Sequence, residues 1–447
     1  MKILLTSIEI SFLGGAREVG RSCIFIKKKD TCILLDAGIN LGKASEEELY
    51  PLEPTDRPTA VFITHAHLDH SGYLPAVISK YDCSEFATPP TQDLGELLQI
   101  DFLKLQKEWE VEAPYTTEDI MAVRSHAVDL NYRVEVDIGE GVRAMLLPSG
   151  HILGAAMIRL RVNNHNILYT GDLSTRNTRT QSMAETAVGK IDTLIIESTY
   201  AAPNDRHPSF QKVERDFIES INKALDRGGR VLVPVFAVGR AQEVMLSLEA
   251  YIRSGVLSHV PIYIDGMIKK VNEVYRLYWT YLRPTIRRQI RYTRQSPLES
   301  DIFVEVHQRK DINIDDPCII ISTSGMLEGG PVIEYLKRIA GDPKSLICLT
   351  GYQVPGTRGR RLQDGEREIR LSPNSEPIKV RSEIKTFEFS AHADQSGLFR
   401  FISKIKELKR VYCVHGEEWK TIEYAERIEE LKNVDAYSPM NGETYLI

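Results

Sequence analysis

The sequence predicts an α/β protein of more than one structural unit, in which a mostly parallel sheet follows a strand-rich first part. The chain has 447 residues, more than one hydrophobic core usually supports, so two or three units are expected. Residues 1–200 contain mainly short apolar or alternating stretches, as strands do. From about residue 205 helical and strand-like stretches alternate, and this βαβ order implies parallel strands.

In the first part, residues 24–26 and 32–35 are predicted to form a hairpin, and the buried strand 60–63 runs directly into a histidine cluster. Helices are expected at 91–107 and 116–126, and further strands at 142–147, 156–162, 167–170 and 191–196.

The second part begins with helix 209–226, strand 230–233, helix 240–253, strand 262–264, helix 267–281, strand 319–322 and helix 331–339. Residues 357–385 are rich in Gly, Arg and Pro, and loops and hairpins are expected there. The end returns to strand 386–389, helix 396–408, strand 411–414 and helix 417–431.

Composition indicates a soluble cytoplasmic protein without membrane association, because no apolar run is long enough to cross a bilayer and the start does not look like a signal peptide. The net charge of −6 gives no global support for nucleic-acid binding, so a nucleic-acid ligand would need a local positive surface. None of the six cysteines forms a Cys-x-x-Cys pair, which favours buried reduced thiols over a cysteine metal site.

A dense cluster of metal-ligand types lies between Thr64 and Gly72. It contains His65, His67, Asp69 and His70 at a strand-to-helix turn, where side chains two or three residues apart can converge. Imidazole and carboxylate together suit zinc and similar ions. Three further candidates, His151, Asp172 and His415, each follow an apolar strand, and functional groups collect at the open end of a sheet sandwich.

In this order the residues resemble the metallo-β-lactamase superfamily. The resemblance implies two Zn²⁺ per subunit, with His65, His67 and His151 on one ion, Asp69, His70 and His415 on the other, and Asp172 bridging both. Asp36, in Leu34-Leu35-Asp36-Ala37-Gly38, matches the superfamily's first motif, whose carboxylate orients ligands by hydrogen bonds.

Three features narrow the resemblance to the β-CASP nucleases: the inserted βαβ region, Ile195-Ile196-Glu197-Ser198-Thr199-Tyr200, and Phe389-Ser390-Ala391-His392-Ala393-Asp394. The implied fold is an α/β protein with a metallo-β-lactamase αββα sandwich and an inserted β-CASP domain built on a mostly parallel sheet. The expected domains are 1–200, 201–383 and 384–447, with the β-CASP domain in the middle.

The chain most resembles the archaeal cleavage-and-polyadenylation-specificity-factor-like branch, through residues 13–22 and 322–330, with ribonuclease J as a close second. Relatives with added KH domains differ, because this chain starts directly at the nuclease core. In DNA-processing members the position of His415 is aliphatic, so a histidine there points to RNA.

The resemblance implies a zinc-dependent ribonuclease for RNA processing or decay that cuts single-stranded RNA with a metal-bridging hydroxide, mainly internally, leaving a 3′-hydroxyl and a 5′-phosphate. His392, polarised by Glu197, would protonate the departing oxygen, and Asp69 counts as catalytic as well as ligating. The alternatives are a 5′-to-3′ exoribonuclease of the ribonuclease J type, a small-molecule metallo-hydrolase and a non-catalytic RNA-binding scaffold.

Basic residues near the second motif are predicted to hold RNA: Arg358, Arg360, Arg361, Lys379 and Arg381. The arginines between residues 283 and 294 are interpreted instead as a solvated helix face. Ser322, Ser324 and Gly325 form either a phosphate nest or a plain helix cap. Glu328 nearby would repel a terminal phosphate, which favours internal cleavage.

The chain ends on apolar residues, Tyr445, Leu446 and Ile447, so its end is expected to be docked. Archaeal relatives form homodimers through this region, and the same assembly is predicted here.

Overall fold

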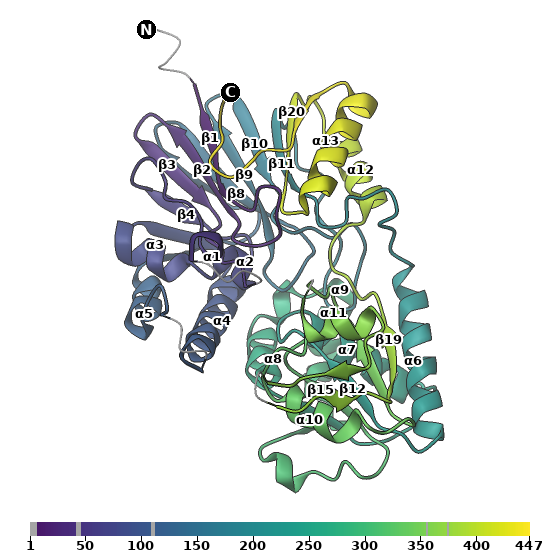
Figure 1. Ribbon diagram of the computed structural model, residues 1–447. Coiled ribbons are helices and arrows are strands. Elements are labelled where there is room, and N and C mark those ends of the chain that lie inside the picture. Colours follow the sequence, from purple (N-terminus) through teal and green to yellow (C-terminus); the bar gives the residue numbers. More distant parts are fainter. Residues whose placement is uncertain (1–6, 42–45, 109–111, 355, 373–374) are drawn as a thin grey trace. The chain divides into compact units, whose positions relative to one another are not determined.

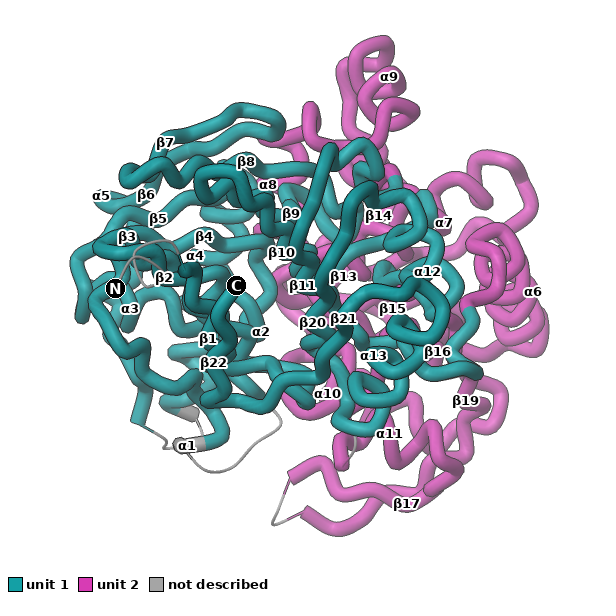
Figure 2. Tube along the Cα trace, turned by 90° about the horizontal axis from the view of Figure 1, so that it is seen from above, with its two compact units in different colours: residues 1–177, 183–206, 391–447 teal, residues 178–182, 207–390 magenta. Residues whose placement is uncertain are grey.

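The computed structural model describes residues 7–41, 46–108, 112–354, 356–372 and 375–447. The chain forms two compact units (Figure 2). Unit 1 comprises residues 1–177, 183–206 and 391–447, and unit 2 comprises 178–182 and 207–390. The short segment 178–182 therefore belongs to unit 2, although it lies within the first of the three domains expected from the sequence.

Unit 1 contains two seven-stranded sheets (Figure 1). The first has the order β22 (Thr444–Leu446), β1 (Glu9–Gly14), β2 (Cys23–Lys28), β3 (Thr31–Leu35), β4 (Ala60–Phe62), β5 (Ser84–Ala87) and β6 (Ala127–Asp129). The second has the order β21 (Asp435–Tyr437), β20 (Arg410–Val414), β11 (Thr193–Glu197), β10 (His165–Tyr169), β9 (Ala156–Val162), β8 (Val142–Pro148) and β7 (Glu135–Gly139).

Alternating apolar residues on the two sheets pack against one another and form the inner core, which includes Phe12, Ile24, Leu146 and Ile158. The outer face of the first sheet packs on α3 (Leu74–Tyr81), and that of the second on α12 (Gln395–Lys404) and α13 (Glu418–Lys432). The layers are therefore helix, sheet, sheet and helix, and the predicted αββα sandwich is confirmed. Helices α4 (Pro89–Glu108) and α5 (Thr117–His126) correspond to the two helices expected in this part.

Unit 2 is built on one six-stranded sheet in the order β14 (Phe303–Glu305), β13 (Ile262–Asp265), β15 (Ile319–Ser322), β12 (Val231–Pro234), β16 (Leu346–Leu349) and β19 (Glu383–Thr386). All its neighbouring strands pair in parallel, so the predicted parallel sheet is confirmed. Its helices include α6 (Phe210–Asp226), α7 (Arg240–Arg253) and α10 (Val332–Ile339).

Unit 2 differs from expectation in three elements. The helix expected at 267–281 divides into α8 (Ile268–Leu277) and the 3₁₀ turn η1 (Trp279–Tyr281), and α9 (Pro284–Thr293) follows. Residues expected to be a loop form α11 (Arg358–Gln363), because the Thr357 side chain accepts a hydrogen bond from the Arg360 amide and caps the helix. The last strand, β19, ends at Thr386, where the sequence had indicated a strand beginning.

All six cysteines are buried and reduced, as predicted. Among the described residues, no helix is both long and apolar enough to cross a membrane.

Candidate metal centre

The candidate metal ligands lie where strands of unit 1 end. β10, β11 and β20 run parallel to one another, so their carboxyl ends meet at one edge of the second sheet, and β8 runs in the same direction. These ends are followed by His151 after β8, Asp172 after β10 and His415 after β20, while Glu197 is the last residue of β11. The first sheet contributes the cluster from His65 to His70, which follows β4 and enters the short helix α2 (Leu68–Ser71).

The two carboxylate oxygens of Asp172 face different pairs of histidines. Its Oδ2 atom lies 3.4 Å from Nε2 of His65 and 3.5 Å from Nε2 of His151. Its Oδ1 atom lies 3.3 Å from Nε2 of His70 and 3.6 Å from Nε2 of His415. One carboxylate thus stands between two pairs of imidazoles.

Each pair has one further candidate ligand beside it. Nδ1 of His67 lies 3.2 Å from Nε2 of His151, and Oδ2 of Asp69 lies 3.7 Å from Nε2 of His415. Ligand atoms from His65, His67, His151 and Asp172 all lie within 4.8 Å of one another, and so do those from His70, Asp172 and His415. The structure therefore brings together all seven residues that the sequence proposed as ligands.

These atoms fit a bound cation. Asp172 is only 2% exposed, and its Oδ1 and the Nε2 atoms of His65 and His70 are buried without a hydrogen-bond partner among the described residues. A buried carboxylate without compensating charge is costly. Burial lowers the pKa of His151 and, to a lesser extent, of His415, so both imidazoles are neutral and able to bind a metal. Several histidines with shared carboxylates form a donor set that zinc prefers.

Asp36 holds His70 in the orientation that a metal ligand needs. Its buried carboxylate accepts hydrogen bonds from Nδ1 of His70 at 2.7 Å, from the Thr64 amide at 2.7 Å and from the Tyr169 hydroxyl at 2.8 Å. Because Nδ1 carries the proton, the lone pair of Nε2 points toward Asp172. The position of Asp36 is the one that the sequence motif implied.

Other ligand histidines are oriented by residues that the sequence analysis did not single out. Nδ1 of His415 hydrogen-bonds to the Ser22 hydroxyl at 2.9 Å, and Nδ1 of His65 to the Thr64 hydroxyl at 3.1 Å. Nδ1 of His151 donates to the Ala391 carbonyl at 3.2 Å. Ser22 lies in the Gly-rich segment 13–22, which was the available signal, although it had been used only for the family resemblance.

His392 and Glu197 form a pair beside the ligands. Nδ1 of His392 lies 3.0 Å from Oε2 of Glu197, whose Oε1 accepts a hydrogen bond from the Leu173 amide at 2.8 Å. Nε2 of His392 lies 3.9 Å from Oδ2 of Asp172. Burial alone would lower the pKa of His392, but the carboxylates of Glu197 and Asp172 outweigh it and raise the pKa to about 9. The imidazole is thus a proton donor at neutral pH.

The proposed phosphate nest lies in unit 2, at the carboxyl end of β15. The Ser322 hydroxyl is buried and has no hydrogen-bond partner in the described part of the chain, whereas the Ser324 hydroxyl donates to the Gly329 carbonyl. A Cβ at Gly325 would lie 3.0 Å from the Phe236 amide nitrogen, so a larger residue would crowd the close approach of the two loops. The next helix, α10, begins only at Val332, so the segment is not a direct helix cap.

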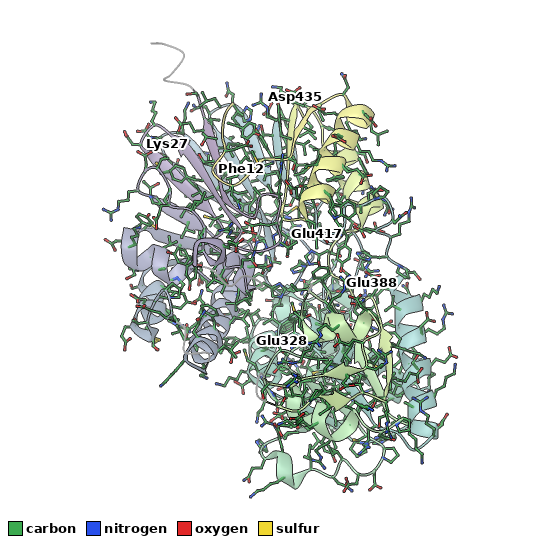
Figure 3. All side chains as sticks on the ribbon, viewed as in Figure 1. Phe12, Lys27, Glu328, Glu388, Glu417 and Asp435 are labelled. Atoms are coloured by element: carbon green, nitrogen blue, oxygen red, sulfur yellow. The ribbon has the colours of Figure 1, made fainter. Side chains whose placement is uncertain are left out.

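The arginines expected to hold RNA are engaged within unit 2. Arg358 lies 3.1 Å from the carboxylate of Glu328, a side chain labelled in Figure 3, and also donates to backbone carbonyls. Arg360 pairs with Asp364, and Arg361 with Glu366. Lys379 and Arg381 are exposed, and their side chains form no ion pair with any described residue.

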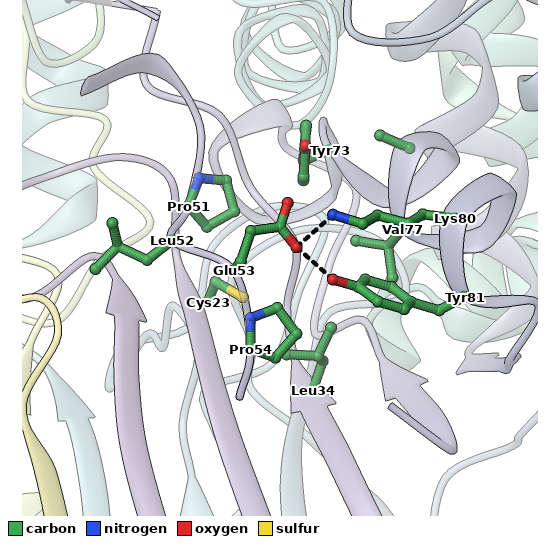
Figure 4. A pocket seen from close by; sticks show the side chains of 11 residues that line it. Cys23, Leu34, Pro51, Leu52, Glu53, Pro54, Tyr73, Val77, Lys80 and Tyr81 are labelled. Atoms are coloured by element: carbon green, nitrogen blue, oxygen red, sulfur yellow. Dashed lines mark hydrogen bonds and ion pairs between the residues drawn. The ribbon is translucent and has the colours of Figure 1, made fainter. Parts of the chain in front are cut away.

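A separate pocket in unit 1 lies between α3 and the loop at residues 51–54 (Figure 4). Its volume of about 10 Å³ leaves room for about one water molecule. The only carboxylate in its lining, Glu53, is bound by Lys80 at 2.7 Å and by the Tyr81 hydroxyl. The pocket therefore offers no ligand site comparable to the histidine cluster.

Comparison with known proteins agrees with this geometry. Residues 16–221 match the metallo-beta-lactamase superfamily, residues 241–362 the Beta-Casp domain, and residues 377–439 the Zn-dependent metallo-hydrolase RNA specificity domain. A solved structure described as a protein of unknown function from Enterococcus faecalis V583 has the same fold, with a TM-score of 0.62 at 17% identity, and covers 99% of this chain and 100% of its own.

Two curated relatives come from Methanocaldococcus jannaschii. The transcription termination factor FttA is 39% identical, over 97% of this chain and 71% of the relative. An RNase J-like protein is 38% identical, over 97% of this chain and 98% of the relative. A second FttA, from Lokiarchaeum, is 37% identical over 99% of this chain and 72% of its own length. The chain therefore belongs to the β-CASP family of metallo-β-lactamase-fold ribonucleases, metal-dependent hydrolases that act on RNA.

Proposed function

We propose that this protein is a two-zinc ribonuclease that cuts single-stranded RNA mainly within the chain, leaving a 3′-hydroxyl and a 5′-phosphate. The supporting observation is Asp172, whose two oxygens face separate groups of histidines in a buried site. His65, His67 and His151 would hold one ion, Asp69, His70 and His415 the other, and Asp172 would bridge them. Asp36 would keep its role of orienting His70.

Two bound Zn²⁺ ions would lower the pKa of a shared water and neutralise the charge of the scissile phosphate. His392 supplies the proton that the departing 3′ oxygen needs, since its Nε2 atom lies 3.9 Å from Oδ2 of Asp172, beside the ligand cluster. Glu197 holds the other nitrogen and keeps the imidazole charged. Because the Leu173 amide also binds Glu197, the orientation of His392 is fixed by the backbone.

Internal cleavage is favoured by the hydrogen bonding of the proposed phosphate nest in unit 2. The Ser324 hydroxyl already donates to Gly329, so it is not available to a terminal phosphate. Glu328 repels a terminal phosphate less than its charge alone suggests, because Arg358 pairs with that carboxylate. Ser324 and Gly325 would then shape the loop, and the exposed Lys379 and Arg381 remain candidate phosphate contacts.

A 5′-to-3′ exoribonuclease of the ribonuclease J type is the second candidate. It is favoured by the buried Ser322 hydroxyl, which has no hydrogen-bond partner among the described residues and could receive a terminal phosphate at the carboxyl end of a parallel sheet. The RNase J-like relative also matches over almost its whole length. A small-molecule hydrolase has no comparable observation in its favour.

The relatives named as transcription termination factors suggest that the substrate is a nascent or recently made transcript, processed or degraded in the cytoplasm. We also infer a homodimer formed through the C-terminal region. β22 is the outermost strand of its sheet, so one of its edges has no neighbouring strand among the described residues.

The direct test is incubation of the purified protein with end-labelled single-stranded RNA, with and without a chelator, followed by sizing of the products. We expect internal fragments that disappear with chelator and return with added zinc. Undegraded RNA together with hydrolysis of a thioester would assign the protein to the small-molecule hydrolases.

A further inference from the structure

A stretch of unit 2 between Glu273 and Glu299 is rich in positive charge and contains no acidic residue. These 25 intervening residues contain six arginines and five aromatic residues but no aspartate, glutamate or lysine, in a chain whose net charge is −6. They form the last four residues of α8, the turn η1 and the whole of α9. Positive charge is therefore concentrated here rather than balanced locally, as it is in α11.

Half of the six arginines are used within unit 2. Arg276 pairs with Glu299 at 3.3 Å, Arg283 donates to the Thr178 carbonyl at 2.8 Å, and Arg287 donates to the Thr280 carbonyl. These three fix the segment to its own unit. The sequence interpretation of a solvated helix face therefore explains them only in part, because a solvated face usually alternates charges of both signs.

The other three, Arg288, Arg291 and Arg294, are exposed, and their side chains form no ion pair or hydrogen bond with any described residue. They are spaced three residues apart, with Arg288 and Arg291 in α9 and Arg294 at its C-cap, so the like charges of Arg288 and Arg291 repel one another and destabilise the helix slightly. No residue of α9 is buried, and Figure 2 shows the helix extending from the body of unit 2. An external anion would relieve the repulsion.

An aromatic side chain lies in the same face. Tyr292 is 85% exposed, follows Arg291 directly and comes four residues after Arg288, one turn of helix. A guanidinium group can bind two oxygens of one phosphate at once, and an exposed aromatic ring can stack on any base. An acidic protein surface could pair with the arginines, but unlike RNA it would offer no base on which Tyr292 could stack.

We propose that Arg288, Arg291, Tyr292 and Arg294 form an accessory binding surface for single-stranded RNA. The arginines bind successive phosphates and Tyr292 stacks on a base. This inference rests on the proposed function, since it supplies the local positive surface that an RNA substrate requires of a negatively charged chain. It also replaces the prediction that Arg358, Arg360 and Arg361 hold the RNA.

The test measures RNA binding separately from cleavage. The full-length, zinc-loaded His392→Ala protein is titrated against a fluorescein-labelled single-stranded RNA by anisotropy, at several salt concentrations. In that protein, Arg288→Glu with Arg291→Glu should weaken binding about tenfold. It should also reduce the slope of log K against log salt by about 1.4, since each lost phosphate contact removes about 0.7.

The matched control is Lys212→Glu with Arg215→Glu on α6. Both are exposed basic residues three positions apart on one helix, and the charge change is the same, but Asp216 and Glu219 lie beside them. This variant should bind RNA nearly as well as its parent. Tyr292→Ala should weaken binding several-fold, whereas Tyr292→Phe should preserve it, because stacking needs the ring and not the hydroxyl.

The proposal is overturned if the α9 variant keeps its affinity and salt slope, or if both double variants lose equal affinity, which would indicate a general charge effect. Loss of binding to polyglutamate with unchanged RNA binding would assign α9 to an acidic protein partner. A native protein that never cleaves RNA but binds it through α9 would refute the proposed function and leave this surface standing.

Discussion

Asp172 is the residue on which the metal centre depends. It is buried, and each of its oxygens faces a different pair of imidazoles. Asp172→Ala should therefore lower the zinc content of the purified protein and abolish RNA cleavage, because both ion sites lose their shared ligand. Elemental analysis of the metal-loaded variant measures the first effect. Two zincs per chain and full cleavage in this variant would rule out a bridging role.

His392 is expected to act in chemistry without binding metal. His392→Ala should retain zinc and RNA affinity but cleave about 10²- to 10⁴-fold more slowly, which is the usual contribution of a general acid. Single-turnover cleavage rates, measured beside zinc content, separate the two roles. A fall in zinc occupancy would instead make His392 a ligand, which the proximity of Asp172, Glu197 and His392 allows geometrically.

The sequence could predict the ligand residue types but not the groups that orient them. The ligands form a recognisable pattern, and Asp36 belongs to a motif. Ser22 and His415 are 393 positions apart and lie next to strands of different sheets, β2 and β20, and only the packing of the two sheets brings the hydroxyl within 2.9 Å of the imidazole. Such a contact follows from which strand ends face each other, and no local spacing encodes that.

At the scale of elements, β5 contains a buried acid. Burial raises the pKa of Glu85 to about 8, against the lowering effect of its hydrogen bond from Gln92. The folded state therefore holds a proton that the unfolded state releases from about pH 4.5 upward, so stability should decrease as pH rises from about 4.5 to 8.

Glu85→Gln should remove this loss, because the amide resembles the protonated acid. The variant should melt at a higher temperature than the parent at about pH 8 but not at about pH 5, with each unit of pKa shift worth about 1.4 kcal/mol. Calorimetry at both pH values measures the difference in melting temperature, with the exposed Glu112→Gln variant as the control. Equal melting differences at both pH values would contradict a buried protonated acid.

The proposed dimer would form at the C-terminal strand β22, so its test must leave that strand intact. It pairs antiparallel with β1, and Tyr445 packs on Phe12 and Tyr412, so removing the last residues would damage the sheet itself. Leu446 is 62% exposed at the same edge, and Leu446→Asp should shift a dimer toward monomer without unfolding it. Light scattering beside the exposed Leu431→Asp control on α13 measures this shift. A monomeric parent protein would refute the proposed assembly.

Helix α11 shows where counting charges fails. The sequence favoured RNA contacts by Arg360 and Arg361, yet these side chains pair with Asp364 and Glu366. The spacing of four between Arg360 and Asp364 was a visible sign of a helical ion pair, but the Gly-rich composition obscured the helix. The alternating order of strands and helices, by contrast, was sufficient to predict the parallel sheet of unit 2, because the hydrophobic pattern repeats over many residues.

For the whole molecule, the candidate functional residues are distributed over the two units. Unit 1 contains every proposed metal ligand together with His392 and Glu197, from both the first and the last part of the chain. Unit 2 contains the serine nest and the basic surface of α9. We propose that together these residues make a zinc-dependent enzyme that cuts an RNA strand internally.

Circular single-stranded RNA tests this claim most directly, because it has no end for an exonuclease to enter. The zinc-loaded protein should linearise the circle and leave a 5′-phosphate and a 3′-hydroxyl, and a chelator should prevent the cut. Circles that stay intact while linear 5′-monophosphorylated RNA is degraded would contradict the account and identify a 5′-to-3′ exoribonuclease instead.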